Sequence, residues 1–169
     1  MVDSSTNLSY FVVMKHDTPA VRAWRSLLAY HSEVIYRIER ELKEAGAIPL
    51  SAYDILIELE TSPQKRMRMY DLSQACILTK SGATKIVNTL EKQGYLTREK
   101  CPSDLRGFHA VISAKGSAAV RKAWPVYREA IQKLFTAALT KAEINSLEKI
   151  MPRLRAALPG NFMKSACGE

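Results

Sequence analysis

Hydrogen-bonding side chains recur at helical spacing in the middle of the chain, and their chemistry suits the edges of nucleic-acid bases. Asn88 can pair with an adenine at two atoms, and Lys85 can donate to guanine or to a phosphate. Thr84 can bond to a phosphate or contact a thymine methyl group. The same predicted helix face also carries Thr79, Lys80, Ser81 and Gly82. As a set, these residues predict contact with duplex DNA, and the alternative is an ordinary solvated helix surface.

A helix-turn-helix is the element that would position this face. The pattern predicts a short helix over about residues 70–76 and a second over about 80–93, with Thr79 as N-cap of the second and Gly94 as its end. The residues expected to face inward are Leu72, Ala75, Ile86, Val87 and Leu90. Ala83 is small, which would let the two helices cross closely.

A β-hairpin with a charged tip is predicted to follow. Residues 95–101 and 108–113 alternate as strands do, and residues 102–107 would join them. Its cations are Arg98, Lys100 and Arg106. Asp104 stands two residues before Arg106, and a carboxylate there can hold the guanidinium in one rotamer. An ordered arginine at a hairpin tip suits the minor groove, although Asp104 could also cap its own turn.

Positive charge is concentrated on this same segment. Residues 62–122 carry 12 Lys or Arg against 4 Asp or Glu, a net charge of +8. Residues 1–61 carry 6 against 9, a net of −3, and residues 123–169 carry 7 against 4, a net of +3. Cations gathered on a groove-reading module indicate a polyanionic partner, for which double-stranded DNA is the first candidate.

Two helical segments precede the central module. Thr18 is expected to cap the first, with Pro19 at its first position and Gly46 at its end. Ser51 is expected to cap the second. The break between this helix and the module falls at about residues 61–63, and residues 66–69 could form a short strand.

Two further helical segments follow the module. Ser113 is expected to cap the first, and Pro125 to kink it because proline removes one ladder hydrogen bond. Thr140 and Glu143 form a capping box that would open a last helix through Leu158. These outer helices have broad apolar faces that a small winged module cannot cover, which predicts a homodimer. The alternative is an intramolecular bundle.

The expected fold is therefore mainly α with a small β-hairpin, a winged helix-turn-helix with N- and C-terminal dimerisation helices. The predicted divisions are a mobile N-terminal arm (1–17), N-terminal dimerisation or linking helices (18–61), the winged helix-turn-helix DNA-binding module (62–113), C-terminal dimerisation helices (114–158) and a tail (159–169).

The sequence shows none of the motifs that would indicate an enzyme or a metal-binding protein. The chain has no Gly-rich phosphate loop and no HExxH, and its histidines, His16, His31 and His109, lack metal-ligand spacing. We therefore expect no enzyme, metal or cofactor. The cysteines, Cys76, Cys101 and Cys167, form no CxxC, which argues against a disulfide framework. No secretory signal or membrane span is recognisable, so a cytoplasmic protein is expected.

The chain resembles the MarR family (multiple antibiotic resistance regulators) in four stretches, which are residues 68–75, 78–98, 104–107 and 112–116. Order and spacing match over about residues 20–158. The resemblance implies a homodimeric repressor that binds a pseudo-palindromic operator and is released by small, often phenolic or aromatic, ligands. The commonest family wing has a second cation between its Asp and Arg. Here that position is Leu105, which implies one phosphate contact fewer.

Ligands of the family bind in the crevice between the dimer lobe and the DNA-binding lobe. By that resemblance Trp24, His31 and Tyr53 are candidate ligand-binding residues, and the alternative is that they pack in the core or in an interface.

Three rival functions remain open from the sequence. The first is an architectural DNA-binding protein without sequence preference or ligand. The second is a protein-interaction module that reuses the fold without DNA, and the basic central segment counts against it. The third is a thiol-based redox sensor, because Cys101 stands near cations that would lower a thiol pKa. Family members that sense peroxides use a cysteine in the N-terminal region, and this chain has none before Cys76.

Overall fold

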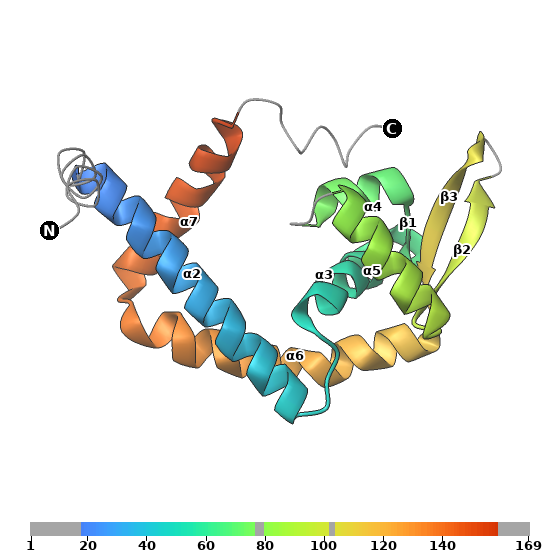
Figure 1. Cartoon of the computed structure of the whole chain (residues 1–169), viewed down its shortest axis with the longest axis horizontal. Coiled ribbons are helices and arrows are strands. Elements are labelled where there is room, and N and C mark those ends of the chain that lie inside the picture. The colour runs from blue at the N-terminus through green and yellow to red at the C-terminus, as the bar shows by residue number, and fades with distance from the viewer. Residues whose placement is uncertain (1–17, 77–79, 102–103, 159–169) are drawn as a thin grey trace, which may run out of the picture. The chain divides into compact units, whose positions relative to one another are not determined.

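The computed structural model describes residues 18–76, 80–101 and 104–158, and it is mainly helical with one small antiparallel sheet (Figure 1). The helices are α2 (Pro19–Glu44), α3 (Leu50–Thr61), α4 (Met69–Ala75), α5 (Lys80–Lys92), α6 (Ala114–Leu134) and α7 (Lys141–Ala156). The strands are β1 (Arg66–Arg68), β2 (Leu96–Cys101) and β3 (Asp104–Ile112), and the short 3-10 turns are η1 (Pro63–Lys65) and η2 (Thr136–Ala138). The expected fold class is confirmed.

The chain divides into two compact units, Met1–Arg37 and Ile38–Glu169. In the first unit, α2 begins where the sequence predicts, since the Val21 N–H donates to Thr18 Oγ1 at 3.3 Å. All described side chains from residue 18 to residue 33 are exposed. Across the described ranges, every helix is too short or too polar to cross a bilayer.

The start of α3 differs from the prediction. Ser51 was expected to be its N-cap, which is wrong, because the helix already begins at Leu50 with Pro49 in the N-cap position. The Leu50 N–H instead donates to Glu39 Oε1 of α2 at 3.0 Å. The carboxylate that serves this helix end is therefore remote in sequence, so a search for local capping residues could not find it. The turn before it contains Gly46, as expected, at a φ of 59°.

The core of the second unit lies where α3 meets α4, α5, α6 and β3. Its largest fully buried side chains are Leu42, Ile55, Leu56, Leu59, Leu72, Val87, Leu90 and Leu96. Each such side chain contributes about 1.5–3 kcal/mol by leaving water. Through these contacts α4, α5 and the sheet all pack against α3 and share one core.

The helix-turn-helix forms as predicted, with α4 beginning one residue earlier than expected. Leu72, Ala83, Val87 and Leu90 are buried, which confirms their inward positions, whereas Ala75 and Ile86 are only half-buried. Thr79, the expected cap of α5, lies outside the described residues.

Gly94 ends α5 at a φ of 75°, a conformation that favours glycine. The next N–H, of Tyr95, donates to the Leu90 carbonyl at 2.9 Å, which is the bond expected of a glycine-terminated helix. The expected end of α5 is therefore confirmed.

The sheet has the order β1-β3-β2, with both pairs antiparallel. The expected short strand is β1. The predicted second hairpin strand began at Phe108, which is wrong, because β3 begins at Asp104. Lys100 pairs with Phe108 but Cys101 pairs with Asp104, so the register shifts between them. Such an irregularity adds residues to one strand and hides the period-two pattern by which strands are recognised.

The junction of β3 with α6 brings backbone segments very close together. Ser113 caps α6 as predicted, accepting from the Gly116 N–H at 3.0 Å, and its hydroxyl donates to the Gly94 carbonyl at 2.7 Å. A Cβ atom placed on Gly116 would lie 2.2 Å from the Tyr95 carbonyl oxygen. Glycine is therefore required where α6 passes the end of α5.

The last helix begins as predicted and ends earlier. Thr140 and Glu143 form the expected capping box. The expected end was Leu158, but α7 ends at Ala156 with Ala157 as its C-cap. Pro125 lies within α6, and the kink expected there stays a prediction.

Candidate nucleic-acid interface

The outer face of α5 carries the side chains predicted to read bases. Its exposed members are Thr84, Lys85 and Asn88, and Gly82 is half-buried. Lys80 and Ser81 form the first turn of α5, but their side chains lie outside the described part of the chain. Because the opposite face of α5 is packed in the core, the exposed face is held by a rigid support.

Lys115 stabilises the C-terminal end of α5. Its Nζ donates to the Gln93 carbonyl at 2.7 Å and lies 4.7 Å from the centroid of the Tyr95 ring. A cation is favoured at a helix C-terminus and over an aromatic face. The sequence predicts no contact for Lys115, and the structure shows that it supports this end of α5.

The hairpin next to α5 carries the predicted wing cations. Lys100 is exposed on β2, and Arg98 is partly exposed on the same strand. The backbone of Asp104 and Arg106 belongs to β3, but the structure does not describe their side chains. The Asp104–Arg106 clamp therefore stays a prediction.

Arg98 bonds to α5, the predicted recognition helix of the helix-turn-helix. Its Nη2 donates to Asn88 Oδ1, and its Nη1 lies 3.4 Å from Glu91 Oε2. Asn88 and Glu91 are three residues apart on α5 and thus share a face. The Arg98 side chain is 26% exposed. Sequence reasoning missed Glu91, although its spacing from Asn88 was a usable signal once a cation on the wing was expected.

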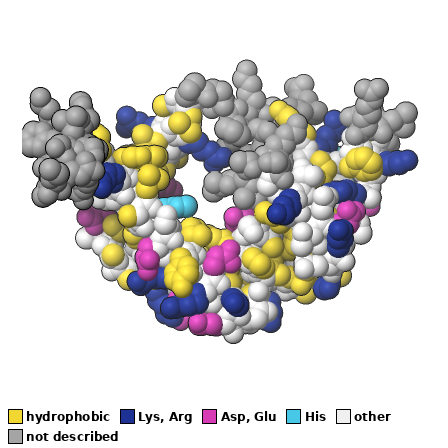
Figure 2. All heavy atoms as spheres, viewed as in Figure 1, with side chains coloured by type: hydrophobic (Ala, Val, Ile, Leu, Met, Phe, Trp, Pro, Cys, Tyr) yellow, Lys and Arg dark blue, Asp and Glu magenta, His cyan; other side chains and the backbone are white. Residues whose placement is uncertain are grey.

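Two cations beside β1 are also paired with carboxylates. Lys65 Nζ lies 2.6 Å from Glu60 Oε1, and Arg66 Nη1 lies 3.4 Å from Glu99 Oε2. The hydrogen bond from Lys65, and then one from Ser117, lowers the pKa of Glu60. These pairs reduce the positive charge that the segment can offer to DNA. Figure 2 shows Lys and Arg side chains at the surface of this region with Asp and Glu among them.

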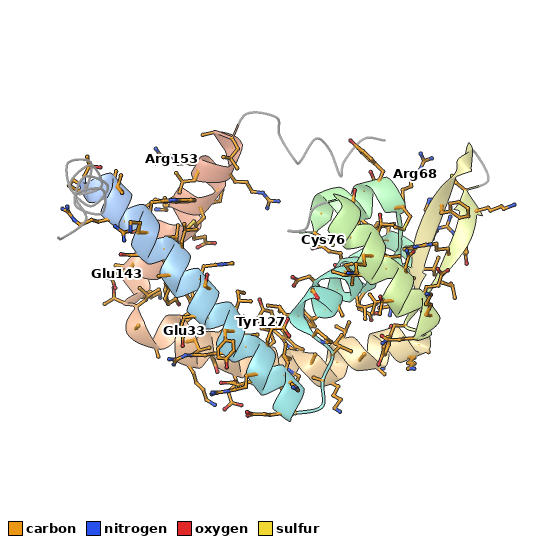
Figure 3. All side chains as sticks on the ribbon, viewed as in Figure 1. Glu33, Arg68, Cys76, Tyr127, Glu143 and Arg153 are labelled. Carbon is orange, nitrogen blue, oxygen red and sulfur yellow. The ribbon has the colours of Figure 1, made fainter. Side chains whose placement is uncertain are left out.

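Arg68 lies at the junction of β1 and α4, where it occupies the N-cap position of the helix (Figure 3). Tyr70, in the first turn of α4, is 63% exposed. Neither residue is among the DNA contacts predicted from the sequence. An aromatic ring exposed next to a helix-turn-helix is a further candidate for nucleic-acid contact, because an exposed ring can pack on sugar or base.

The three candidate ligand-binding residues differ in environment. Trp24 is 60% exposed and His31 is exposed, both on the first unit. Tyr53, in the second unit, is buried and packs edge-on against Tyr127 with ring centroids 5.2 Å apart. Burial is the main cause that raises the pKa of Tyr53, followed by the neighbouring Tyr127. The contact with Tyr127 supports the alternative that Tyr53 packs in the core. That Trp24, His31 and Tyr53 bind a ligand together stays a prediction.

The cysteines that the structure describes, Cys76 and Cys101, are both buried. Burial, with Glu58 and Asp54 nearby, raises the pKa of the Cys76 thiol to about 12 (Figure 3). Cys101 is 3% exposed, which argues against a reactive thiol because oxidants need access to sulfur. Within the described ranges, no group of three His, Cys, Asp or Glu side chains could hold a metal ion.

Comparison with known proteins agrees with this geometry. The sequence profile of the MarR family matches residues 48–107, which cover α3 to the hairpin. The chain is 30% identical to Sco3205, a MarR family transcriptional regulator from Streptomyces coelicolor whose crystal structure is in complex with DNA. That similarity covers 82% of this chain and 87% of Sco3205, with a TM-score of 0.76.

Two further relatives are similar over most of their length. AbsC, a MarR family transcriptional regulator from Streptomyces coelicolor, is 29% identical over 82% of this chain and 97% of its own, with a TM-score of 0.72. The transcriptional repressor MprA of Escherichia coli K12 is 28% identical over 134 residues, 79% of this chain and 75% of MprA. The chain belongs to the MarR family of winged helix-turn-helix transcription regulators. It is a DNA-binding regulator, and its family comprises regulators rather than enzymes.

Proposed function

We propose that this regulator is a repressor that binds a pseudo-palindromic operator as a homodimer. The observation that carries the proposal is the exposed polar face of α5, held against a buried core and placed beside a basic hairpin. A helix of this kind fits the major groove, and a neighbouring hairpin fits the adjacent backbone and minor groove. The DNA complex of Sco3205, which shares the family and 30% of its residues, supports the same use here.

The proposed contacts divide by element. From α5 and its start they are Thr79, Lys80, Ser81, Gly82, Thr84, Lys85 and Asn88, and from the hairpin they are Arg98, Lys100, Asp104 and Arg106. Residues of α5 would carry base preference because they reach base edges. Residues of the hairpin would mainly contribute affinity, because phosphate and minor-groove contacts carry little base information.

The homodimer is proposed to form through the terminal helices. In α7, the side chains of Ile150, Met151 and Leu154 are 43%, 43% and 56% exposed. In α2, Trp24 and Leu28 are exposed as well. Apolar side chains repeated along a helix normally require a covering surface, and a second copy of the chain supplies one. Residues 18–61 and 114–158 would thus serve dimerisation, and residues 62–113 would bind DNA.

The segments at the chain ends have proposed roles of their own. Residues 1–17 would act as an arm that packs on the partner subunit, and residues 159–169 as a tail. We place the action of this regulator in the cytoplasm.

Release of DNA by a small aromatic or phenolic effector completes the proposal. An effector acts by binding better to a dimer whose two recognition helices are wrongly spaced for successive major grooves. Membership of the MarR family supports this route. A thermal-shift screen of aromatic acids and phenols, repeated with Trp24→Ala, His31→Ala and Tyr53→Phe, would identify an effector and show whether these side chains contact it.

The test of DNA binding is a salt titration with the native promoter fragment and a scrambled fragment of equal length. A dimer that neutralises on the order of 6–10 phosphates gives a log–log slope of similar size. A repressor prefers the promoter fragment at every salt concentration. Equal affinity for both fragments, with no effect of any effector, would instead support an architectural protein. A flat salt response contradicts both.

A further inference from the structure

The hydrogen bond between Arg98 of β2 and Asn88 of α5 determines how the Asn88 amide is turned. An arginine side chain has donors and no acceptor, so the Asn88 atom that faces it must be the carbonyl oxygen Oδ1. The bond joins Arg98 Nη2 to this oxygen. The amide nitrogen Nδ2 consequently occupies the other position, and Asn88 is exposed on the outer face of α5.

Arg98 is held in this position by more than one group. Glu91 lies one turn beyond Asn88 on α5, and its Oε2 is 3.4 Å from Arg98 Nη1. The Nε atom of Arg98 is buried and has no hydrogen-bond partner among the described residues, so the stem of the Arg98 side chain packs inward. Moving Asn88 Oδ1 away would deprive the partly exposed Arg98 guanidinium of an acceptor, and bonds to charged donors are the stronger class.

This arrangement conflicts with the prediction from the sequence that Asn88 pairs with adenine. An asparagine that pairs with adenine uses Oδ1 to accept from N6 and Nδ2 to donate to N7. With Oδ1 turned toward Arg98, one of its lone pairs is taken, and the atom of the Asn88 amide that is turned away from Arg98 is Nδ2, which only donates. Guanine presents two acceptors, N7 and O6, in the major groove, and thymine presents O4.

We propose that Arg98 sets the specificity of the recognition helix by turning the Asn88 amide, so that Asn88 selects guanine or thymine and disfavours adenine. Arg98 is then a positioning residue, and Glu91 helps to hold it. The inference rests on the proposed function, in which Asn88 faces the major groove. It assigns to a wing-strand arginine a part in base selection that its charge alone would not predict.

The experiment is selection of binding sites from a random DNA library, followed by affinity measurements on single-base variants of the selected site. Asn88→Ala first identifies the base pair that Asn88 reads, as the position where discrimination falls by roughly 5- to 150-fold. At that position the wild-type protein should prefer guanine or thymine, and the variants of the site distinguish the two. Arg98→Met, which keeps an apolar stem but removes the donors, should admit adenine at that position and leave the others unchanged.

Lys100→Ala is the matched control. It removes a cation from the same strand without touching Asn88, so it should weaken binding to all sequences and leave the preference at this position intact. Glu91→Gln tests the support of Arg98 and should shift the preference in the same direction as Arg98→Met, by less. Thermal melting shows whether each variant is folded, and Glu91→Gln still tests the proposal should Arg98→Met be unfolded.

Two results would overturn the proposal while leaving DNA binding intact. One is a wild-type preference for adenine at the position that depends on Asn88, or no such position at all. The other is an unchanged preference in both folded Arg98→Met and Glu91→Gln. Failure to select any site with the wild-type protein is a different outcome, because it would contradict the proposed operator binding itself.

Discussion

The helices α5 and α7 are both amphipathic, yet they differ in what covers their apolar faces. In α5, Ala83, Val87 and Leu90 are almost completely buried. In α7, no side chain is buried, and Leu154 remains more than half exposed. The packing of α5 is therefore complete within one chain, which leaves its polar face available for DNA. The packing of α7 is incomplete within one chain, which makes it suited to a second copy.

The largest expected effect comes from breaking the covered side of α5. Leu90→Ala should lower the free energy of unfolding by about 2–5 kcal/mol, because it removes a fully buried side chain and leaves a cavity. Leu90→Met, which conserves volume, should cost less than about 1.5 kcal/mol. Urea denaturation followed by circular dichroism measures both. Equal, small losses for the two variants would mean that α5 is not held by this core.

The next effect concerns the uncovered side of α7. Leu154→Glu should dissociate the proposed dimer, raising its dissociation constant by roughly 100-fold or more, because two symmetry-related carboxylates would enter an apolar contact. Lys149→Glu, at an exposed position of the same helix, is the control and should leave the dimer intact. Light scattering decides between a dimer and a 19.0 kDa chain. A dimer that tolerates Leu154→Glu would place the interface elsewhere.

A third prediction separates the two elements proposed to bind DNA. Lys85→Ala on α5 should cost about 1–3 kcal/mol on the operator and relax preference at particular bases. Arg106→Ala on the hairpin should weaken binding to all sequences by a similar factor, and Asp104→Ala should follow it. Fluorescence anisotropy on operator and scrambled DNA measures the difference. Full affinity in Asp104→Ala would show that this carboxylate does not orient Arg106.

The smallest expected effect lies in α3, which supports α5. Burial, with Glu58 and Glu39 nearby, raises the pKa of Asp54 from 3.8 to about 6. The folded state therefore binds this proton more tightly than the unfolded state, so the contribution of Asp54 to stability falls as pH rises from about 4 to 6. Asp54→Asn should remove this loss and stabilise the fold at pH 7 by the order of 1 kcal/mol, allowing for partial solvent screening. Melting curves of the two proteins that stay parallel from pH 4 to pH 7 would contradict this.

Local sequence patterns were sufficient to predict the start of a helix where a side chain next to that start accepts a hydrogen bond from the helix's own backbone N–H groups. The capping residues Thr18, Ser113 and Thr140 were all predicted, because a side-chain oxygen and the N–H it accepts from are three residues apart. The start of α3 was missed because its cap is Glu39, eleven residues away. The start of β3 was missed because a register shift breaks the alternation that identifies a strand.

The candidate site shows the same division. The sequence by itself determined the class of protein, since inward positions such as Ala83, Val87 and Leu90 repeat at helical spacing and cations gather in one segment. It could list Asn88 and Arg98, but it could not show that they bond to each other. That contact was decided by the tertiary structure, because it depends on how β2 packs beside α5. Hydrogen-bond direction is a property of paired atoms in space, and an amide that could read adenine in isolation is turned the other way by a neighbouring strand.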